Sequence, residues 1–165
     1  MFIGTHTLLP VAIGLGIDNA RLAAGRDEVF PAWSIPVVGL FGALPDLCTP
    51  HLSLEARYAS WSHTLVFLAA ALPLAAMVAT VFPKGTRLAC ALAFWLATAL
   101  HLACDAMSGG VAWLLPWDDS ILGTYLIHPD YWVAADAVFV FLTWLMLSLR
   151  RWLRGRAVAC SATAA

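Results

Sequence analysis

The sequence has little charge. Only 12% of its 165 residues are Asp, Glu, Lys or Arg, whereas 62% are hydrophobic. The mean hydropathy is +0.83. A soluble domain carries about 25% charged residues, so this composition excludes an ordinary soluble domain. An apolar excess of this size in one domain indicates a core that is shared with lipid. The sequence therefore predicts an integral membrane protein.

The sequence also lacks a surplus of basic residues and a pattern of paired cysteines. The net charge is −1, so there is no surplus of Lys and Arg to neutralise phosphates, and we expect no nucleic-acid partner. The four cysteines show no CxxC spacing and give no disulfide framework. The cysteines thus leave the redox compartment open, and the sequence says nothing about the oligomeric state.

Apolar segments predict the fold class, an all-α bundle of about five membrane helices. Three segments are long enough to cross a bilayer, namely residues 61–82, 88–107 and 133–149. Two weaker segments, 2–17 and 29–44, are interrupted by proline, so we expect shorter or tilted helices there. The first of these lacks a basic n-region and a clear cleavage site, so we expect a retained helix rather than a signal peptide. We expect one transmembrane domain over residues 1–153 and a disordered cytoplasmic tail over 154–165.

Basic residues predict the orientation. Eight of the nine Lys and Arg residues lie in or beside two loops, 18–28 and 83–87, and the C-terminal segment 150–156. Five crossings bring these three segments to one side of the membrane, and the positive-inside rule makes that side cytoplasmic. Only Arg57 falls on the outer side. We expect a multi-pass protein of the inner (cytoplasmic) membrane with a cytoplasmic C-terminus.

The same topology gathers candidate metal ligands near the outer face. His101 and Asp105 are four residues apart, so they share one face of a helix, and both residue types bind metals. His6, Asp46 and His63 fall near the same face on other segments. Imidazoles and carboxylates suit zinc, manganese or iron better than calcium. A divalent cation would also relieve the repulsion between two carboxylates in a low dielectric.

Polar residues near this face could also have structural roles. His101 with Asp105 alone could be a polar pair that ties helices together. His128 lies in a His-Pro-Asp sequence and could be part of a turn or a ligand. Asp136 could contact the N-terminal dipole of the last helix or bind a second metal. Arg57, the only basic residue on the outer face, is a candidate to hold a phosphate.

Four short motifs occur in an order that resembles a known family. They are Thr5-His6, Gly42-Ala-Leu-Pro-Asp46, Trp61-Ser62-His63-Thr64, and His101-x-x-x-Asp105 followed by Gly109-Gly110 and Leu115-Pro116. Over about residues 5–140 the chain resembles the membrane-bound metal-dependent hydrolases of bacteria, described as LexA-binding and inner-membrane-associated. The resemblance implies that five residues are metal ligands: His6, Asp46, His63, His101 and Asp105.

This family is similar in its ligand order to zinc-dependent phospholipase C, which holds three zinc ions with an additional His-x-x-x-Glu pair. The only glutamates here are Glu28 and Glu55, so the chain has no such pair. The resemblance thus implies one or two ions, with zinc favoured, and a second ion would need His128 or Asp136. The LexA-binding label implies a cytoplasmic partner, but the predicted inner loops are too short to offer a large interface.

These observations favour a metal-dependent hydrolase that cleaves an ester or phosphoester bond of a lipid, with Asp46 or Asp105 as general base and Arg57 on a phosphate. The alternative is a non-catalytic metal-binding protein for ion passage or for assembly with a partner. A transporter would carry polar residues through the depth of the bundle. Residues 70–82 and 88–97 contain no charge, which favours a site on one side only.

Overall fold

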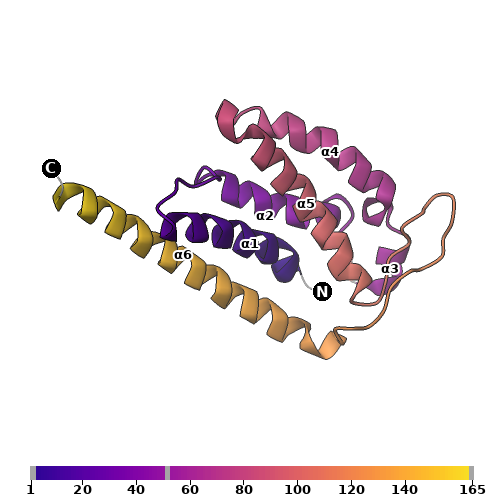
Figure 1. The fold of residues 1–165 in the computed structure, drawn as a ribbon. Coiled ribbons are helices and arrows are strands. Elements are labelled where there is room, and N and C mark those ends of the chain that lie inside the picture. The colour runs from indigo at the N-terminus through magenta and orange to yellow at the C-terminus, as the bar shows by residue number, and fades with distance from the viewer. Residues whose placement is uncertain (1–2, 51–52, 164–165) are drawn as a thin grey trace.

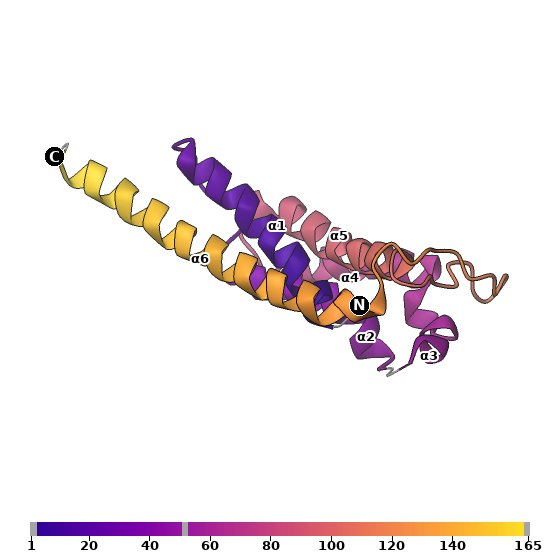
Figure 2. The same cartoon turned by 90° about the horizontal axis from the view of Figure 1, so that it is seen from below.

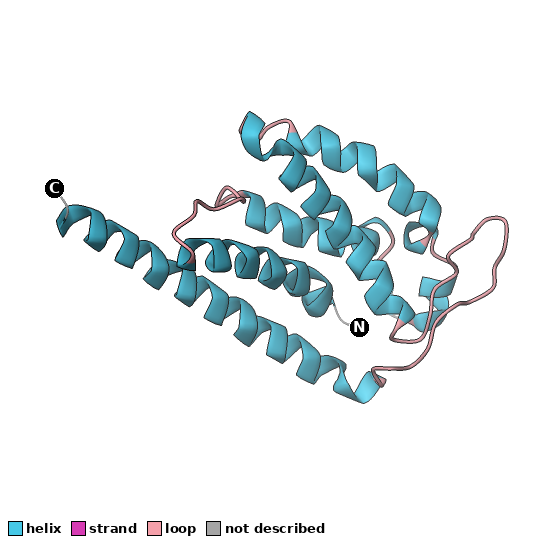
Figure 3. Ribbon diagram, viewed as in Figure 1, coloured by secondary structure: helices cyan, strands magenta, loops and turns pink. Residues whose placement is uncertain are grey.

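The computed structural model describes residues 3–50 and 53–163, and within them the chain is helical, with loops between the helices (Figure 3). The α-helices are α1 (Ile3–Ala23), α2 (Ser34–Cys48), α3 (Leu54–Tyr58), α4 (Leu65–Ala79), α5 (Arg87–Ala106) and α6 (Trp132–Thr163). Single 3-10 turns precede three of them, at Trp61–His63, Lys84–Thr86 and Pro129–Tyr131. No strand forms in the described residues, which confirms the all-α prediction. The short helix α3 is the one α-helix that the sequence does not predict.

Two helical stretches are long and apolar enough to cross a membrane, Lys84–Ala106 and Pro129–Arg156, and α2 and α4 are shorter apolar helices. The expected span at 61–82 is therefore shorter than predicted. The chain forms a separate turn at Trp61–His63, and Thr64 then caps α4 by accepting a hydrogen bond from the Phe67 amide at 3.1 Å. The 15 residues of α4 extend about 22 Å.

The helix α6 is longer than its apolar segment. Its 32 residues extend about 48 Å, so it projects beyond the rest of the bundle (Figure 2). The disordered tail expected over 154–165 is instead helical as far as Thr163, and residues 164 and 165 lie outside the described residues. The helix continues because no proline interrupts it and because Arg154 binds Glu28 through an Nη2–Oε2 ion pair of 2.5 Å.

The helices pack in a row. The helix α1 lies between α6 and α2, α2 packs on α5, and α4 covers the other side of α5 (Figure 1). Aliphatic and aromatic side chains and a cysteine fill the core between α1, α2, α4 and α5, including Val11, Leu15, Val38, Phe41, Ala75, Ala79, Cys90 and Phe94. Because Ala75 and Ala79 are fully buried, α4 can approach α5 closely.

The connections alternate between two ends of the bundle. The α1–α2 loop, the α4–α5 turn and the end of α6 lie at one end, which we call the basic end (Figure 1). Trp33 of the first connection stacks on Phe82 of the second, with 3.7 Å between ring centroids. The start of α1, α3 and the loop of residues 107–128 lie at the opposite end, which we call the site end (Figure 1).

A buried ion network fixes α6 at the basic end. Arg150 of α6 contacts Asp18 of α1 (Nη2–Oδ2, 3.0 Å) and Glu28 of the α1–α2 loop (Nε–Oε1, 2.5 Å). Asp18 also accepts a 2.8 Å hydrogen bond from the amide of Val29. Burial opposes the ionisation of Glu28, but hydrogen bonds from Arg154 and Arg150 outweigh it and lower the pKa of its carboxyl. The network thus joins α1, the loop and α6.

Candidate metal centre

Four potential ligands meet at the site end. Asp46 comes from the last turns of α2, His63 from the 3-10 turn before α4, and His101 and Asp105 from the end of α5. Each residue offers one potential ligand atom, and these four atoms all lie within 4.8 Å of one another. Three of these residues are fully buried, whereas the side chain of Asp46 is 17% exposed. The bundle therefore encloses the cluster and leaves one carboxylate open to the outside.

The spacing of these atoms fits a small cation. The two imidazole Nε2 atoms, of His63 and His101, are 3.2 Å apart. His63 Nε2 lies 3.3 Å from Asp46 Oδ1 and 3.3 Å from Asp105 Oδ2. His101 Nε2 lies 3.5 Å and 3.4 Å from the same two oxygens. Tetrahedral zinc has bonds of about 2.0–2.1 Å to N and O, which gives edges of about 3.3–3.4 Å.

Hydrogen bonds on the far side of each ring orient the two histidines. His101 Nδ1 donates to the carbonyl oxygen of Gly42 at 2.7 Å. Because a carbonyl can only accept, Nδ1 carries the proton, and a neutral His101 presents the lone pair of Nε2 to the cluster. His63 Nδ1 lies 3.0 Å from Ser60 Oγ and 3.2 Å from Ser62 Oγ. Partners of this kind orient metal-binding histidines in proteins.

The charge of the cluster supports a bound cation. Two carboxylates and the Nε2 atom of His101 point at one small volume, and lone pairs that face one another repel. A proton or a metal ion between them removes this repulsion. The donors are nitrogen and oxygen atoms only, and they surround a common centre. The residues present therefore fit a divalent transition metal ion.

Gly42 lets α1 reach the cluster. A Cβ atom at this position would lie 2.3 Å from the carbonyl oxygen of His6 and 2.9 Å from Cγ of Pro10. Only glycine therefore permits the two helix backbones to approach as they do. The approach brings the ring of His6 onto the ring of His101, with 3.9 Å between centroids.

Asp105 links the cluster to a buried arginine. Its Oδ2 faces the two histidines of the cluster, and its Oδ1 accepts a 2.8 Å hydrogen bond from Arg57 Nη1. His6 Nε2 lies 3.2 Å from the same Oδ1. Arg57 is only 2% exposed, and its Nη2 donates to the backbone oxygen of Ser108 at 3.1 Å. Arg57 is thus bound to Asp105, whereas the sequence suggested a cation that was available to a phosphate.

Five of the seven predicted ligands lie together: the four residues of the cluster, and His6, which contacts Asp105. The other two, His128 and Asp136, lie elsewhere. His128 is 62% exposed, and its Nδ1 lies 3.1 Å from Asp130 Oδ2. Asp136 of α6 accepts hydrogen bonds from the Thr5 amide, at 2.7 Å, and from the Thr5 hydroxyl. The carboxylate of Asp136 thus accepts a hydrogen bond from a backbone amide in the first turn of α1, which has no partner within the helix. Both residues lie outside the four-residue cluster.

Sequence reasoning missed the groups that orient the histidines. Ser62 directly precedes His63, and Gly42 opens the Gly-Ala-Leu-Pro-Asp motif, so both stand beside predicted ligands. In metal-binding histidines, the ring nitrogen that does not bind the metal usually donates a hydrogen bond to a nearby oxygen. A search for oxygen-bearing residues beside each predicted ligand could therefore have found Ser62. The backbone oxygen of Gly42 and the contact between Arg57 and Asp105 leave no comparable signal in the sequence.

A family model described as YdjM inner membrane protein matches residues 1–165, the whole chain. No curated protein matches the chain, and no solved structure does. The family description and the apolar helices together confirm the predicted location in the inner membrane. The chain therefore belongs to the YdjM inner membrane protein family.

Proposed function

We propose that this protein is a metal-dependent hydrolase that cleaves an ester or phosphoester bond of a membrane lipid, with zinc as its ion. The observation that supports this most directly is the convergence of two imidazole nitrogens and two carboxylates at one end of a membrane bundle, with 3.2 Å between the nitrogens and 3.3–3.5 Å from each nitrogen to each carboxylate. Buried ionisable groups in membrane helices mark functional sites, because burying them is costly.

Four residues would hold the ion: Asp46, His63, His101 and Asp105. A mixed set of nitrogen and oxygen donors favours zinc over calcium or magnesium, which prefer oxygen ligands. A zinc ion that took water as a fifth ligand beside these four residues would supply hydroxide at neutral pH and would polarise the attacked carbonyl or phosphoryl oxygen. The chain would supply the enclosure, the orientation of the ligands and a group that accepts a proton.

The two carboxylates differ in what they can do. Asp105 is buried, and Arg57 and His6 engage its Oδ1 while its Oδ2 faces the cluster. Asp46 is 17% exposed, so water and substrate can reach it. Of the two candidates that the sequence left open, Asp46 is therefore the better general base, because a base must contact the proton that it takes. Its Oδ1 faces the cluster and would bind the ion, so Oδ2 would be the oxygen that accepts the proton. Asp105 would hold the ion and the ligand geometry.

Arg57 supports a single ion rather than two. Its guanidinium lies 2.8 Å from Asp105 Oδ1, which is the oxygen that a bridging carboxylate would offer to a second metal. A cation already bound there repels another. The two residues that could complete a second metal site, His128 and Asp136, lie outside the cluster.

The position of the cluster supports a lipid substrate. The site lies near the ends of apolar helices, where a substrate in the bilayer reaches it through its head group. Eight of the nine basic residues belong to segments at the other end of the bundle or near it. By the positive-inside rule the site end would face outward and the C-terminus would be cytoplasmic.

The test is a hydrolysis assay on liposomes. The purified protein is incubated with phospholipids and polyprenyl phosphates, and the products are identified by mass spectrometry. We expect turnover that a chelator abolishes and zinc restores. Asp46→Asn should lower the rate at least about 100-fold, as expected for loss of a general base. His128→Asn, outside the cluster, should keep the wild-type rate. Bound metal without turnover of any lipid would contradict the hydrolase and support the non-catalytic alternative.

A further inference from the structure

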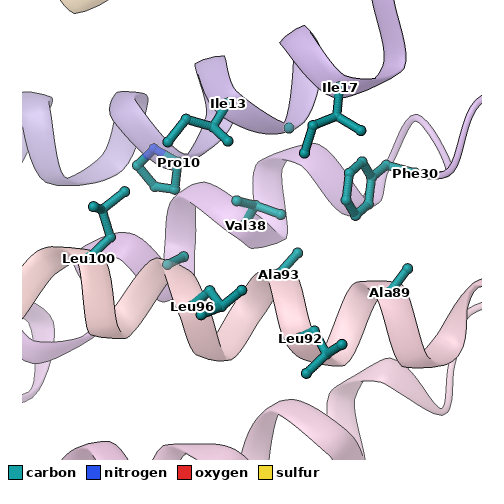
Figure 4. Close-up of a pocket in the computed structure, with 12 residues that line it drawn as sticks. Pro10, Ile13, Ile17, Phe30, Val38, Ala89, Leu92, Ala93, Leu96 and Leu100 are labelled. Atoms are coloured by element: carbon teal, nitrogen blue, oxygen red, sulfur yellow. The ribbon is translucent and has the colours of Figure 1, made fainter. Parts of the chain in front are cut away.

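An apolar groove runs along the bundle between α1 and α5, with α2 as its floor (Figure 4). Its volume is about 280 Å³. The residues that line it are Pro10, Ile13, Gly14 and Ile17 of α1, Phe30 and Val38, and Ala89, Leu92, Ala93, Leu96, Ala97 and Leu100 of α5. Not one of these side chains carries a polar atom. The groove therefore suits a hydrocarbon and offers no hydrogen bond to a polar ligand.

The groove is open to the surroundings of the bundle. Leu92 and Leu96 of α5 are 44% and 54% exposed, and Ile13 and Ile17 of α1 are 48% and 45% exposed. In an inner membrane protein such a rim of apolar side chains faces lipid chains. A lipid tail can thus enter from the side.

One end of the groove lies on the side of the metal centre. Pro10 and Leu100 line this end (Figure 4), Pro10 one helical turn after His6 and Leu100 directly before His101. Ile17, Phe30 and Ala89 line the opposite end (Figure 4). From Ala89 to Leu100 the helix rises about 16 Å.

We infer that this groove binds one hydrocarbon chain of a membrane lipid and thereby places the bond next to its head group at the metal centre. This inference rests on the proposed function and specifies its substrate: a lipid with a hydrocarbon chain at least about 16 Å long, the helical rise from Ala89 to Leu100. Chain binding would supply affinity and orientation, while the cluster acts only on the polar end.

The width of the groove favours a chain over a helix. A helix of diameter about 10 Å and length about 16 Å would need about 1,200 Å³. All the empty space in the groove, with its open mouth included, is about 720 Å³ and is smaller than this. A helix from a second copy of the protein could therefore cover its mouth but could not fill it, whereas a single hydrocarbon chain fits.

Photocrosslinking tests the inference. The wild-type protein is placed in liposomes with phosphatidylglycerol that carries a diazirine near the end of one acyl chain, and the labelled residues are mapped by mass spectrometry. We expect label on the groove residues Ile17, Ala89 and Leu92 several-fold above that on Phe141, which α6 exposes. Equal label on all exposed apolar residues would overturn the inference.

A blocked groove provides the second measurement. Ala93→Phe should fill the middle of the groove, remove the excess label and abolish the retention of one lipid in native mass spectrometry. Ala76→Phe is the matched control, because Ala76 is exposed on α4 and lies outside the groove. Equal retention by both variants would overturn the inference. If Ala93→Phe does not fold, the crosslinked residues of the wild-type protein alone test whether the groove binds a lipid chain.

The outcomes separate this inference from the proposed function. Bound metal and lipid turnover with uniform labelling would overturn the claim that the groove binds a lipid chain, but would support the hydrolase. Groove labelling without turnover would support chain binding and contradict the hydrolase. A mass of two chains with no lipid and no groove label would show that a second copy covers the mouth, and it would overturn the inference.

Discussion

Gly42 has two functions in the metal centre. Its backbone oxygen orients His101, and its missing side chain lets α1 approach so that His6 stacks on that ring. A single position thus sets both a ligand orientation and a helix distance. Substitutions here should affect stability and metal binding together.

We predict that Gly42→Ala lowers the free energy of unfolding by about 1–3 kcal/mol, because the new Cβ would overlap the His6 carbonyl and force α1 away. It should also weaken metal binding. Thermal unfolding in detergent and metal titration measure the two effects. Gly16→Ala is the control, because a Cβ atom there meets nothing within 4 Å. Wild-type metal affinity in Gly42→Ala would contradict this role.

Asp136 is predicted to stabilise α1 without binding the metal. It accepts hydrogen bonds from the amide and hydroxyl of Thr5, as a capping residue does. Asp136→Ala should therefore lower the free energy of unfolding by about 1 kcal/mol, the usual cost of losing a cap, and leave the metal content unchanged. Thermal unfolding and elemental analysis would be measured on the same sample. A loss of metal would instead identify Asp136 as a ligand.

At the scale of elements, α6 is held to the bundle at both ends. Asp136 joins it to α1 at the site end, and Arg150 joins it to α1 and the α1–α2 loop at the basic end. Between them α6 exposes large apolar side chains, among them Phe141 and Trp144. Lipid should cover these side chains, so polar contacts at the two ends fix the position of α6.

We predict that Arg150→Met destabilises the protein by about 3–5 kcal/mol, because it leaves the buried carboxylate of Asp18 without its cation. Thermal unfolding in detergent would show this as a large fall in Tm. The neighbouring Arg151 is exposed, so Arg151→Met should change Tm little and serves as the control. An equal effect of the two variants would show that the network does not hold α6.

At the scale of the whole molecule, local patterns in the sequence predict the helices and the end of the bundle at which the candidate ligands lie. Apolar runs indicate where the long helices lie, and alternating connections bring His6, Asp46, His63, His101 and Asp105 to one end. These features depend on spacing along the chain and on crossing the membrane, both of which the sequence records.

The remaining features depend on contacts between distant residues. Arg57 reaches Asp105 only because the segment around α3 folds back over the end of α5, and charge alone cannot show this. In the helical continuation of α6, Arg154 pairs with Glu28, which lies more than 120 residues earlier in the chain. The length of α4 is set by Thr64, whose capping hydrogen bond starts the helix later than the apolar run does.

The claim that Asp46, His63, His101 and Asp105 hold one divalent ion is tested most directly by metal analysis of the purified protein. Inductively coupled plasma mass spectrometry should find about one zinc ion per chain in the wild-type protein and in His128→Ala, whose side chain is exposed outside the cluster. His63→Ala and His101→Ala should contain almost none. Near-zero metal in all four proteins, or equal metal in all four, would contradict the claim.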